Sequence, residues 1–132
     1  ASLVYWFPKM TGRMLDKKLS WISFWFVQIG FNVAFIGMFF VGLQGQPRRV
    51  EAYAAIFNKG NLVTSIGAAT IMTGMLILLA AVIGSWRSGV KAPMNPWHAK
   101  SLEWTVPYPV PLENFETLPV VSEDVYGYGR KS

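Results

Sequence analysis

Two adjacent arginines, Arg48 and Arg49, are the residues of this chain best suited to binding a charged ligand. They follow Gly45 and Pro47, which favour a turn and end a helix. A guanidinium carries its N–H donors in a fixed fork and binds carboxylates or phosphates bidentately. The pair therefore indicates an anion site. The residues leave open a plainer alternative, in which two interfacial arginines contact lipid headgroups.

The chain offers few other groups for chemistry. Its 132 residues include no cysteine, which excludes a disulfide framework, a thiolate metal site and a cysteine nucleophile. The single histidine, His98, has no second candidate ligand beside it, so we expect a surface residue. No nucleophile–base constellation and no phosphate-binding glycine loop is present. We therefore expect no catalytic residue and no metal ligand in this chain, and no enzymatic activity for it alone.

The composition is that of a membrane protein. Hydrophobic residues make up 52% of the chain and charged residues 14%, against roughly 25% charged residues in soluble domains. The segments 19–43 and 62–86 carry no formal charge and exceed the about 20 apolar residues that span a bilayer. Neither shows the polar stripe of a soluble amphipathic helix. The sequence predicts an all-α membrane protein, a hairpin of two transmembrane helices.

The positive charges predict how this hairpin is oriented. A net charge of +5 could suggest nucleic acid as a partner, but the cations lie at the helix ends, where membrane topology explains them. The loop between the two spans holds three positive charges, Arg48, Arg49 and Lys59. The two ends hold more than twice as many: Lys9, Arg13, Lys17, Lys18, Arg87, Lys91 and Lys100. Because cytoplasmic loops carry the excess of Lys and Arg, we expect both chain ends on the cytoplasmic or matrix side.

The segment that follows the second span has a different amino-acid composition. Prolines recur at 93, 96, 107, 109, 111 and 119, interleaved with large aromatics. Such a pattern favours extended backbone, here a segment laid across a protein surface. We divide the chain into an end of a preceding helix with an inner-side loop (1–18), a span (19–43), an outer loop with the arginine pair (44–61), a second span (62–86) and an extended inner-side tail (87–132).

The two spans differ in their faces. Gln28 and Asn32 in the first span are four residues apart and share one face. Polar groups at membrane depth face protein or a cavity, so we expect that face to turn inward. The second span carries small residues suited to close helix contact, namely Ser65, Gly67, Ala68, Ala69, Gly74, Ala80, Ala81 and Gly84. Two such helices imply partners.

Six segments give the chain a family resemblance. They read YWFPKMTGRM at 5–14, IGFN at 29–32, GLQGQPRR at 42–49, NPW at 95–97, LEW at 102–104 and NF at 114–115. In order and spacing they resemble subunit I of the haem-copper cytochrome oxidases. The chain looks like the C-terminal portion of that subunit: the end of helix ten, helices eleven and twelve, and the tail. The resemblance implies that the hairpin packs into a twelve-helix bundle.

The resemblance also implies a function. The family's proton-pumping terminal oxidases reduce O₂ to water with electrons from cytochrome c. Its arginine pair, carried onto Arg48 and Arg49, binds the propionates of the low-spin haem and of the haem at the binuclear centre. The haems and copper are ligated by the rest of subunit I. Implied partners are that remainder, other oxidase subunits, lipid and the electron donor. The bacterial or archaeal plasma membrane and the mitochondrial inner membrane all fit.

Two alternatives to a cytochrome c oxidase stay open. One is a quinol oxidase of the same family. The other is a non-catalytic two-helix accessory subunit of a respiratory complex, which contacts no cofactor. A hairpin of the second kind would tolerate replacement of Arg48 and Arg49, whereas one that contacts haem would not.

The sequence departs from the family pattern at a few positions. Val50-Glu51-Ala52 stands where the family has an aromatic residue and then an aspartate before the tyrosine. Phe39 replaces a common histidine, Gln46 a common methionine, and Val110 interrupts the proline run of the tail. These differences concern the outer hydrogen-bond network and leave the resemblance intact.

Overall fold

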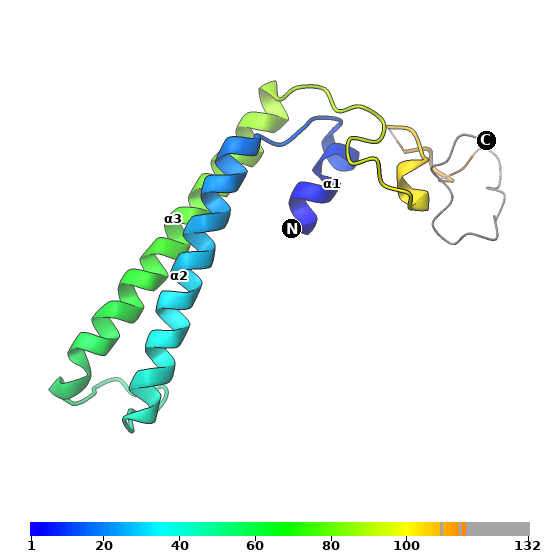
Figure 1. Cartoon of the computed structure of the whole chain (residues 1–132). Coiled ribbons are helices and arrows are strands. Elements are labelled where there is room, and N and C mark those ends of the chain that lie inside the picture. Colours follow the sequence, from blue (N-terminus) through cyan, green and yellow to red (C-terminus); the bar gives the residue numbers. More distant parts are fainter. Residues whose placement is uncertain (109, 114, 116–132) are drawn as a thin grey trace. The chain divides into compact units, whose positions relative to one another are not determined.

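The computed structural model describes residues 1–108, 110–113 and 115, and all regular structure among them is helical (Figure 1). The elements are α1 (Ser2–Thr11), α2 (Lys17–Leu43), the single 3₁₀ turn η1 (Ala55–Phe57), α3 (Asn58–Ser88) and the single 3₁₀ turn η2 (Leu102–Trp104). The described residues form two compact units, one of residues 17–82 and one of residues 1–16 with the described residues from 83 onward. The predicted all-α fold is confirmed.

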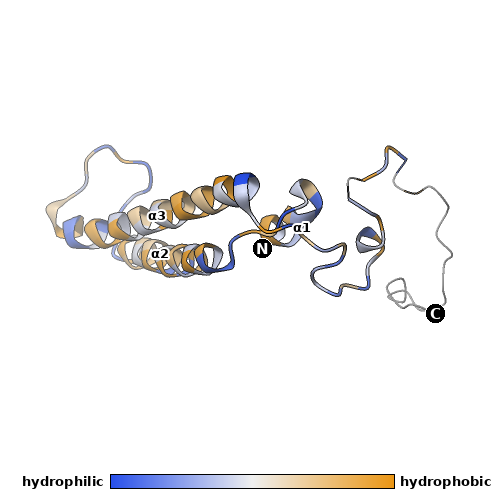
Figure 2. Ribbon diagram, turned by 90° about the horizontal axis from the view of Figure 1, so that it is seen from above, coloured by the Kyte–Doolittle hydropathy of each residue, from blue (hydrophilic) through white to orange (hydrophobic). Residues whose placement is uncertain are grey.

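The helices α2 and α3 form the predicted hairpin, running side by side from the loop that joins them (Figure 1). Both are long and apolar enough to cross a membrane, and apolar residues line them along their length (Figure 2). Their large side chains point outward: Trp21 is 62% exposed, Phe39 64% and Leu62 62%. A soluble bundle would bury such residues, so these surfaces suit lipid or other membrane helices.

A narrow seam of small side chains joins α2 to α3. The buried residues of α2 are Ser23, Gly30, Ala34 and Val41. Those of α3 within the same unit are Thr64, Gly67, Gly74 and Ala81. Successive buried residues are seven, four and seven positions apart in α2, and three, seven and seven positions apart in α3. These are the spacings of a coiled-coil seam. Three of the small residues expected at the contact, Gly67, Gly74 and Ala81, are buried, whereas Ser65, Ala68, Ala69, Ala80 and Gly84 are exposed.

The seam brings the two backbones into contact. A Cβ on Gly30 would lie 2.8 Å from the carbonyl oxygen of Gly67, and a Cβ on Gly67 would lie 2.8 Å from Cα of Ala34. In the same seam the hydroxyl of Ser23 donates a hydrogen bond of 2.8 Å to the carbonyl of Gly74. Only residues without a bulky side chain permit this approach, and it fixes the register in which the helices pair.

The seam leads to a prediction for two glycines of α3. Gly67→Ala places a methyl group against the backbone of Ala34, so we expect the free energy of unfolding to fall by about 1–3 kcal/mol, the usual cost of overpacking. Gly84→Ala is the matched control, because nothing lies within 4 Å of its added Cβ and alanine gains about 1 kcal/mol over glycine in a helix. Thermal unfolding in detergent micelles, followed by near-ultraviolet circular dichroism, separates the two. Equal stability of both variants would contradict the seam.

Candidate functional site

The loop that carries the arginine pair begins with a tight end to α2. Gly45 adopts a φ of +96°, a conformation that glycine reaches at no steric cost. The N–H of Gly45 donates to the carbonyl of Gly42 at 3.0 Å, and the N–H of Gln46 donates to that of Val41 at 3.3 Å. These bonds occupy carbonyls that a helix end leaves unpaired. The chain therefore turns sharply as it leaves α2.

A side-chain hydrogen bond ties the same loop to α3. The amide Nδ2 of Asn61 donates to Oε1 of Gln46 at 3.0 Å. Gln46 thus joins the two helices at their connected end, and a methionine in its place would offer only a weak sulfur acceptor. Only Pro47 separates Gln46 from Arg48, so this hydrogen bond anchors the loop just before the two arginines.

Arg48 and Arg49 lie in a turn and are exposed. Arg49 adopts a φ of +59°, in the left-handed region of backbone conformations. Residues other than glycine, asparagine and aspartate rarely adopt this conformation, and those that do are often found at functional sites. Among the described residues, neither guanidinium has a hydrogen bond or an ion pair. Glu51, two residues on, is exposed as well. The turn therefore presents two neighbouring cations whose donors are available to an anion.

A second site, which the sequence did not predict as such, lies in the other unit. We call Tyr5, Lys9, Trp97 and Trp104 the aromatic clamp. Trp104 donates through Nε1 to the Tyr5 hydroxyl at 2.7 Å, and Trp97 donates through Nε1 to the Tyr5 carbonyl at 2.9 Å. The ring of Tyr5 stands edge-on to Trp104, with centroids 5.3 Å apart, and stacks on Trp97 at 6.2 Å. These contacts hold this part of the tail against α1.

Local structure positions the two tryptophans. Asn95 donates through Nδ2 to the carbonyl of Ala99 at 2.8 Å and accepts from the Ala99 N–H at 3.0 Å. This ring closes a turn that contains Trp97 and His98. His98 is exposed, with a φ of +50°. Trp104 ends the 3₁₀ turn η2 and is only 2% exposed. The Asn-Pro-Trp and Leu-Glu-Trp motifs therefore supply the two tryptophans that donate hydrogen bonds to Tyr5.

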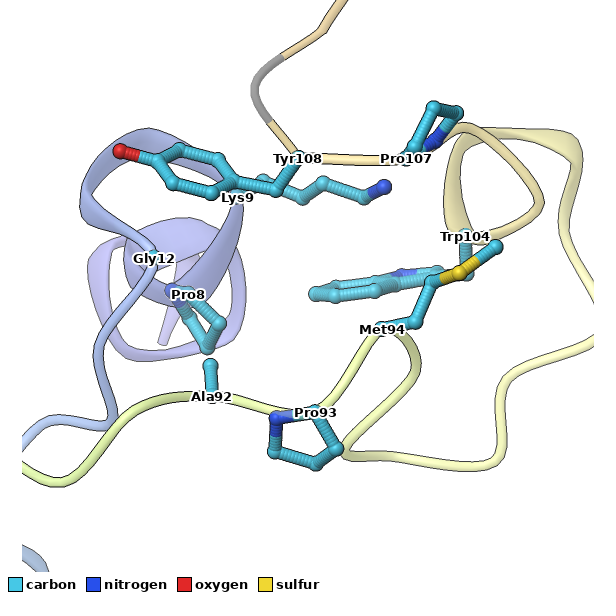
Figure 3. Close-up of a pocket in the computed structure, with 9 residues that line it drawn as sticks. All are labelled: Pro8, Lys9, Gly12, Ala92, Pro93, Met94, Trp104, Pro107 and Tyr108. Atoms are coloured by element: carbon cyan, nitrogen blue, oxygen red, sulfur yellow. The ribbon is translucent and has the colours of Figure 1, made fainter.

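Lys9 completes the clamp and borders a cavity (Figure 3). Its ammonium donates to the carbonyl of Val106 and lies 5.4 Å from the centroid of Trp104, a cation–π contact. Burial lowers the pKa of Lys9 from its ordinary value, and the nearby carboxylate of Glu103 opposes that shift. The cavity has a volume of about 190 Å³. Its lining is made of Pro8, Lys9, Gly12, Ala92, Pro93, Met94, Trp104, Pro107 and Tyr108.

Potential metal ligands do not gather in the part of the chain that the structure describes. Among residues 1–108, 110–113 and 115, no three His, Cys, Asp or Glu side chains come together in a way that could hold a metal ion. The tail residues Asn114 and Glu116, and the carboxylates that follow, lie outside the described residues.

Comparisons with known proteins point to one family. Residues 1–70 match the model of the family described as cytochrome c and quinol oxidase polypeptide I. The chain is similar to cytochrome c oxidase subunit 1 of Thermostichus vulcanus, at 43% identity over 98% of this chain and 23% of that protein. It is similar to the subunits of the same name from Bacillus sp. strain PS3, at 41% identity over 89% of the chain and 20% of that protein, and Bacillus subtilis strain 168, at 40% over 92% and 20%. The chain thus spans between a fifth and a quarter of these relatives.

The clamp leads to a prediction for Tyr5. Tyr5→Phe removes the acceptor of the buried Trp104 N–H, which should weaken the attachment of the tail to α1 by about 1–3 kcal/mol. Hydrogen–deuterium exchange of peptides that cover residues 92–108 should then quicken. Tyr53→Phe is the control, since Tyr53 is 46% exposed. Unchanged exchange in Tyr5→Phe would mean that this hydrogen bond does not hold the tail.

Proposed function

Because the chain belongs to the cytochrome c and quinol oxidase polypeptide I family, we propose that it forms the C-terminal part of the catalytic subunit of a proton-pumping terminal oxidase. Its two helices would pack against the haem-bearing helices of that subunit. The oxidase would reduce O₂ to water with electrons from cytochrome c. The single observation that carries the proposal is the turn at Arg48 and Arg49, whose guanidinium groups have no partner among the described residues.

The role proposed for Arg48 and Arg49 is to bind haem propionates. A propionate is a carboxylate, the group that a guanidinium binds with two parallel, charge-assisted hydrogen bonds. Two adjacent guanidiniums on an anchored turn suit two propionates, one from each of two neighbouring haems. Haem and copper, ligated elsewhere in the subunit, supply the electron transfer and the oxygen chemistry. The arginines hold the haem edges in place, and their positive charge favours the reduced form of a nearby redox centre.

The surroundings of the chain follow from the same proposal. Its partners are the remainder of subunit I, the other oxidase subunits and membrane lipid, with the electron donor acting on the whole complex. The excess of Lys and Arg at the two ends supports an orientation with both ends on the cytoplasmic or matrix side and Arg48 and Arg49 outside. The membrane is the plasma membrane of a bacterium or archaeon, or the inner membrane of a mitochondrion.

Two further candidates remain as alternatives to a cytochrome c oxidase. A quinol oxidase is compatible with the matching family, which includes oxidases of both electron donors. A non-catalytic accessory hairpin would share the two helices but would have no use for a cationic turn. The arginine pair therefore distinguishes the accessory hairpin from the oxidase core, whereas the donor has to be assigned by assay of the complex.

The proposal predicts the effect of neutralising the arginine pair. In the assembled complex, Arg48→Gln and Arg49→Gln each remove one partner of a guanidinium–propionate ion pair that the rest of the subunit would bury. Breaking a buried ion pair in this way costs about 3–5 kcal/mol of stabilising free energy. We expect a shifted reduced-minus-oxidised haem spectrum, a lower haem midpoint potential and slower turnover. The spectrum, a potentiometric titration and oxygen consumption measure these three quantities.

Lys59→Gln is the matched control for the arginine variants. It removes one positive charge from the start of α3, close to the same loop in sequence but outside the arginine turn, and should leave the spectrum and the potential unchanged. Identical spectra, potentials and turnover for Arg48→Gln, Arg49→Gln and the unaltered complex would refute the propionate role and favour the accessory hairpin.

A further inference from the structure

A short backbone bridge brings two cationic residues together just beyond the end of α3. Arg13, in the link between α1 and α2, and Lys91, in the segment that follows α3, form an isolated antiparallel β-bridge. The residue after each cation donates its backbone N–H across the bridge, to the carbonyl of the residue before the opposite cation. These two hydrogen bonds, of 2.8 and 2.9 Å, flank the pair on both sides.

The geometry of this bridge places the two side chains on one face. In an antiparallel pair that is flanked by hydrogen bonds in this way, the two Cα atoms lie about 4.5 Å apart and the side chains approach each other closely. Like charges that are directly opposite each other destabilise such a pair. Arg13 is half-buried and Lys91 is exposed, and among the described residues neither forms an ion pair with a carboxylate. The bridge therefore holds together two positive charges that repel each other.

Both side chains keep hydrogen-bond donors for an anion. Nη1 of Arg13 donates to the carbonyl of Gly89 at 2.6 Å, which fixes the guanidinium at the end of α3. This bond uses only one of the N–H donors of the guanidinium. In the part of the chain that the structure describes, the ammonium of Lys91 has no hydrogen bond. A phosphate oxygen placed between the two residues would accept charge-assisted bonds from both and would remove their repulsion.

The pair lies where α3 leaves the membrane. This helix is long and apolar enough to cross a bilayer and ends at Ser88, shortly before Lys91. Trp86, in its last turn, is 66% exposed, and exposed tryptophans are enriched at the level of the lipid headgroups. Arg87 adds a further exposed positive charge to the same turn. Lipid headgroups are therefore the anions nearest to the bridge.

We propose that Arg13 and Lys91 bind the phosphate group of an anionic phospholipid, such as phosphatidylglycerol. Basic residues close to the end of a membrane span attract anionic headgroups. A zwitterionic headgroup carries an ammonium beside its phosphate, which the two cations repel, so phosphatidylglycerol binds more tightly than phosphatidylcholine. The site requires only the membrane span and the bridge, and it does not depend on the oxidase function proposed above.

Native mass spectrometry of the complex that the full chain forms tests this site. The complex is titrated in detergent micelles with phosphatidylglycerol or phosphatidylcholine, and the dissociation constant of the most tightly bound lipid is measured. Lys91→Gln should weaken the binding of phosphatidylglycerol about tenfold, the loss expected for one charge-assisted hydrogen bond. Lys91→Arg keeps the charge and should bind this lipid as the unaltered complex does.

Lys100→Gln is the matched control. It also removes one exposed positive charge from the same unit, but from a position outside the bridge, and should leave lipid binding unchanged. Circular dichroism of the full chain should be the same for Lys91→Gln and Lys100→Gln, because neither side chain has a hydrogen bond among the described residues. A loss of binding in Lys91→Gln then reports on the site and not on folding.

Glycerophosphoglycerol, which is the headgroup of phosphatidylglycerol without its acyl chains, distinguishes a lipid from a soluble phosphate ester. We expect it to displace the lipid only in large excess. Displacement at equal concentration would show that the site binds a soluble phosphate ester and that the lipid assignment is wrong. Equal lipid binding by Lys91→Gln and Lys100→Gln, or no preference of the unaltered complex for phosphatidylglycerol over phosphatidylcholine, would refute the site itself.

Discussion

The hairpin depends on two helices that approach closely enough for their backbones to touch. In a bilayer, helix association gains little from the hydrophobic effect, so packing and hydrogen bonds must supply the stability. The Gly30, Gly67 and Gly74 positions permit that packing, and the hydroxyl of Ser23 fixes it along the axis. The register set by this seam determines which residues meet at the connected end, where Gln46 and Asn61 join. The orientation of the outer loop is thus a consequence of contacts deep in the span.

Much of the architecture was predictable because it rests on composition and local patterns. Charge-free segments long enough to cross a bilayer leave helices as the natural conformation, and Gly45 with Pro47 marks a turn before the arginines. The contact face of α3 was predicted less well. Because both helices are apolar nearly all round, burial in the seam is not visible as a hydrophobic stripe, and small residues on the exposed faces look the same in sequence as Gly67 or Gly74.

The aromatic clamp shows where local patterns stop. The alternation of prolines and aromatics in the tail indicated a segment lying on a protein surface, but nothing near Trp104 in sequence identifies Tyr5 as its partner. The two residues are separated by 99 positions. The local hydrogen bond of the Trp104 backbone N–H, to the carbonyl of Ser101, does not indicate that distant partner. The strained φ of Arg49 likewise results from the path of the loop, which no residue-type preference predicts.

The long separation between Tyr5 and Trp104 also sets an order of events during synthesis. Residues of α1 leave the ribosome before both long helices, and the tail tryptophans leave only after those helices have been made. Closing such a wide loop costs entropy that no short-range contact repays, so the clamp forms after the chain between them has been inserted and folded. The contact between Tyr5 and Trp104 therefore forms late in the synthesis of the protein. It is absent from any nascent chain whose tail has not yet been translated.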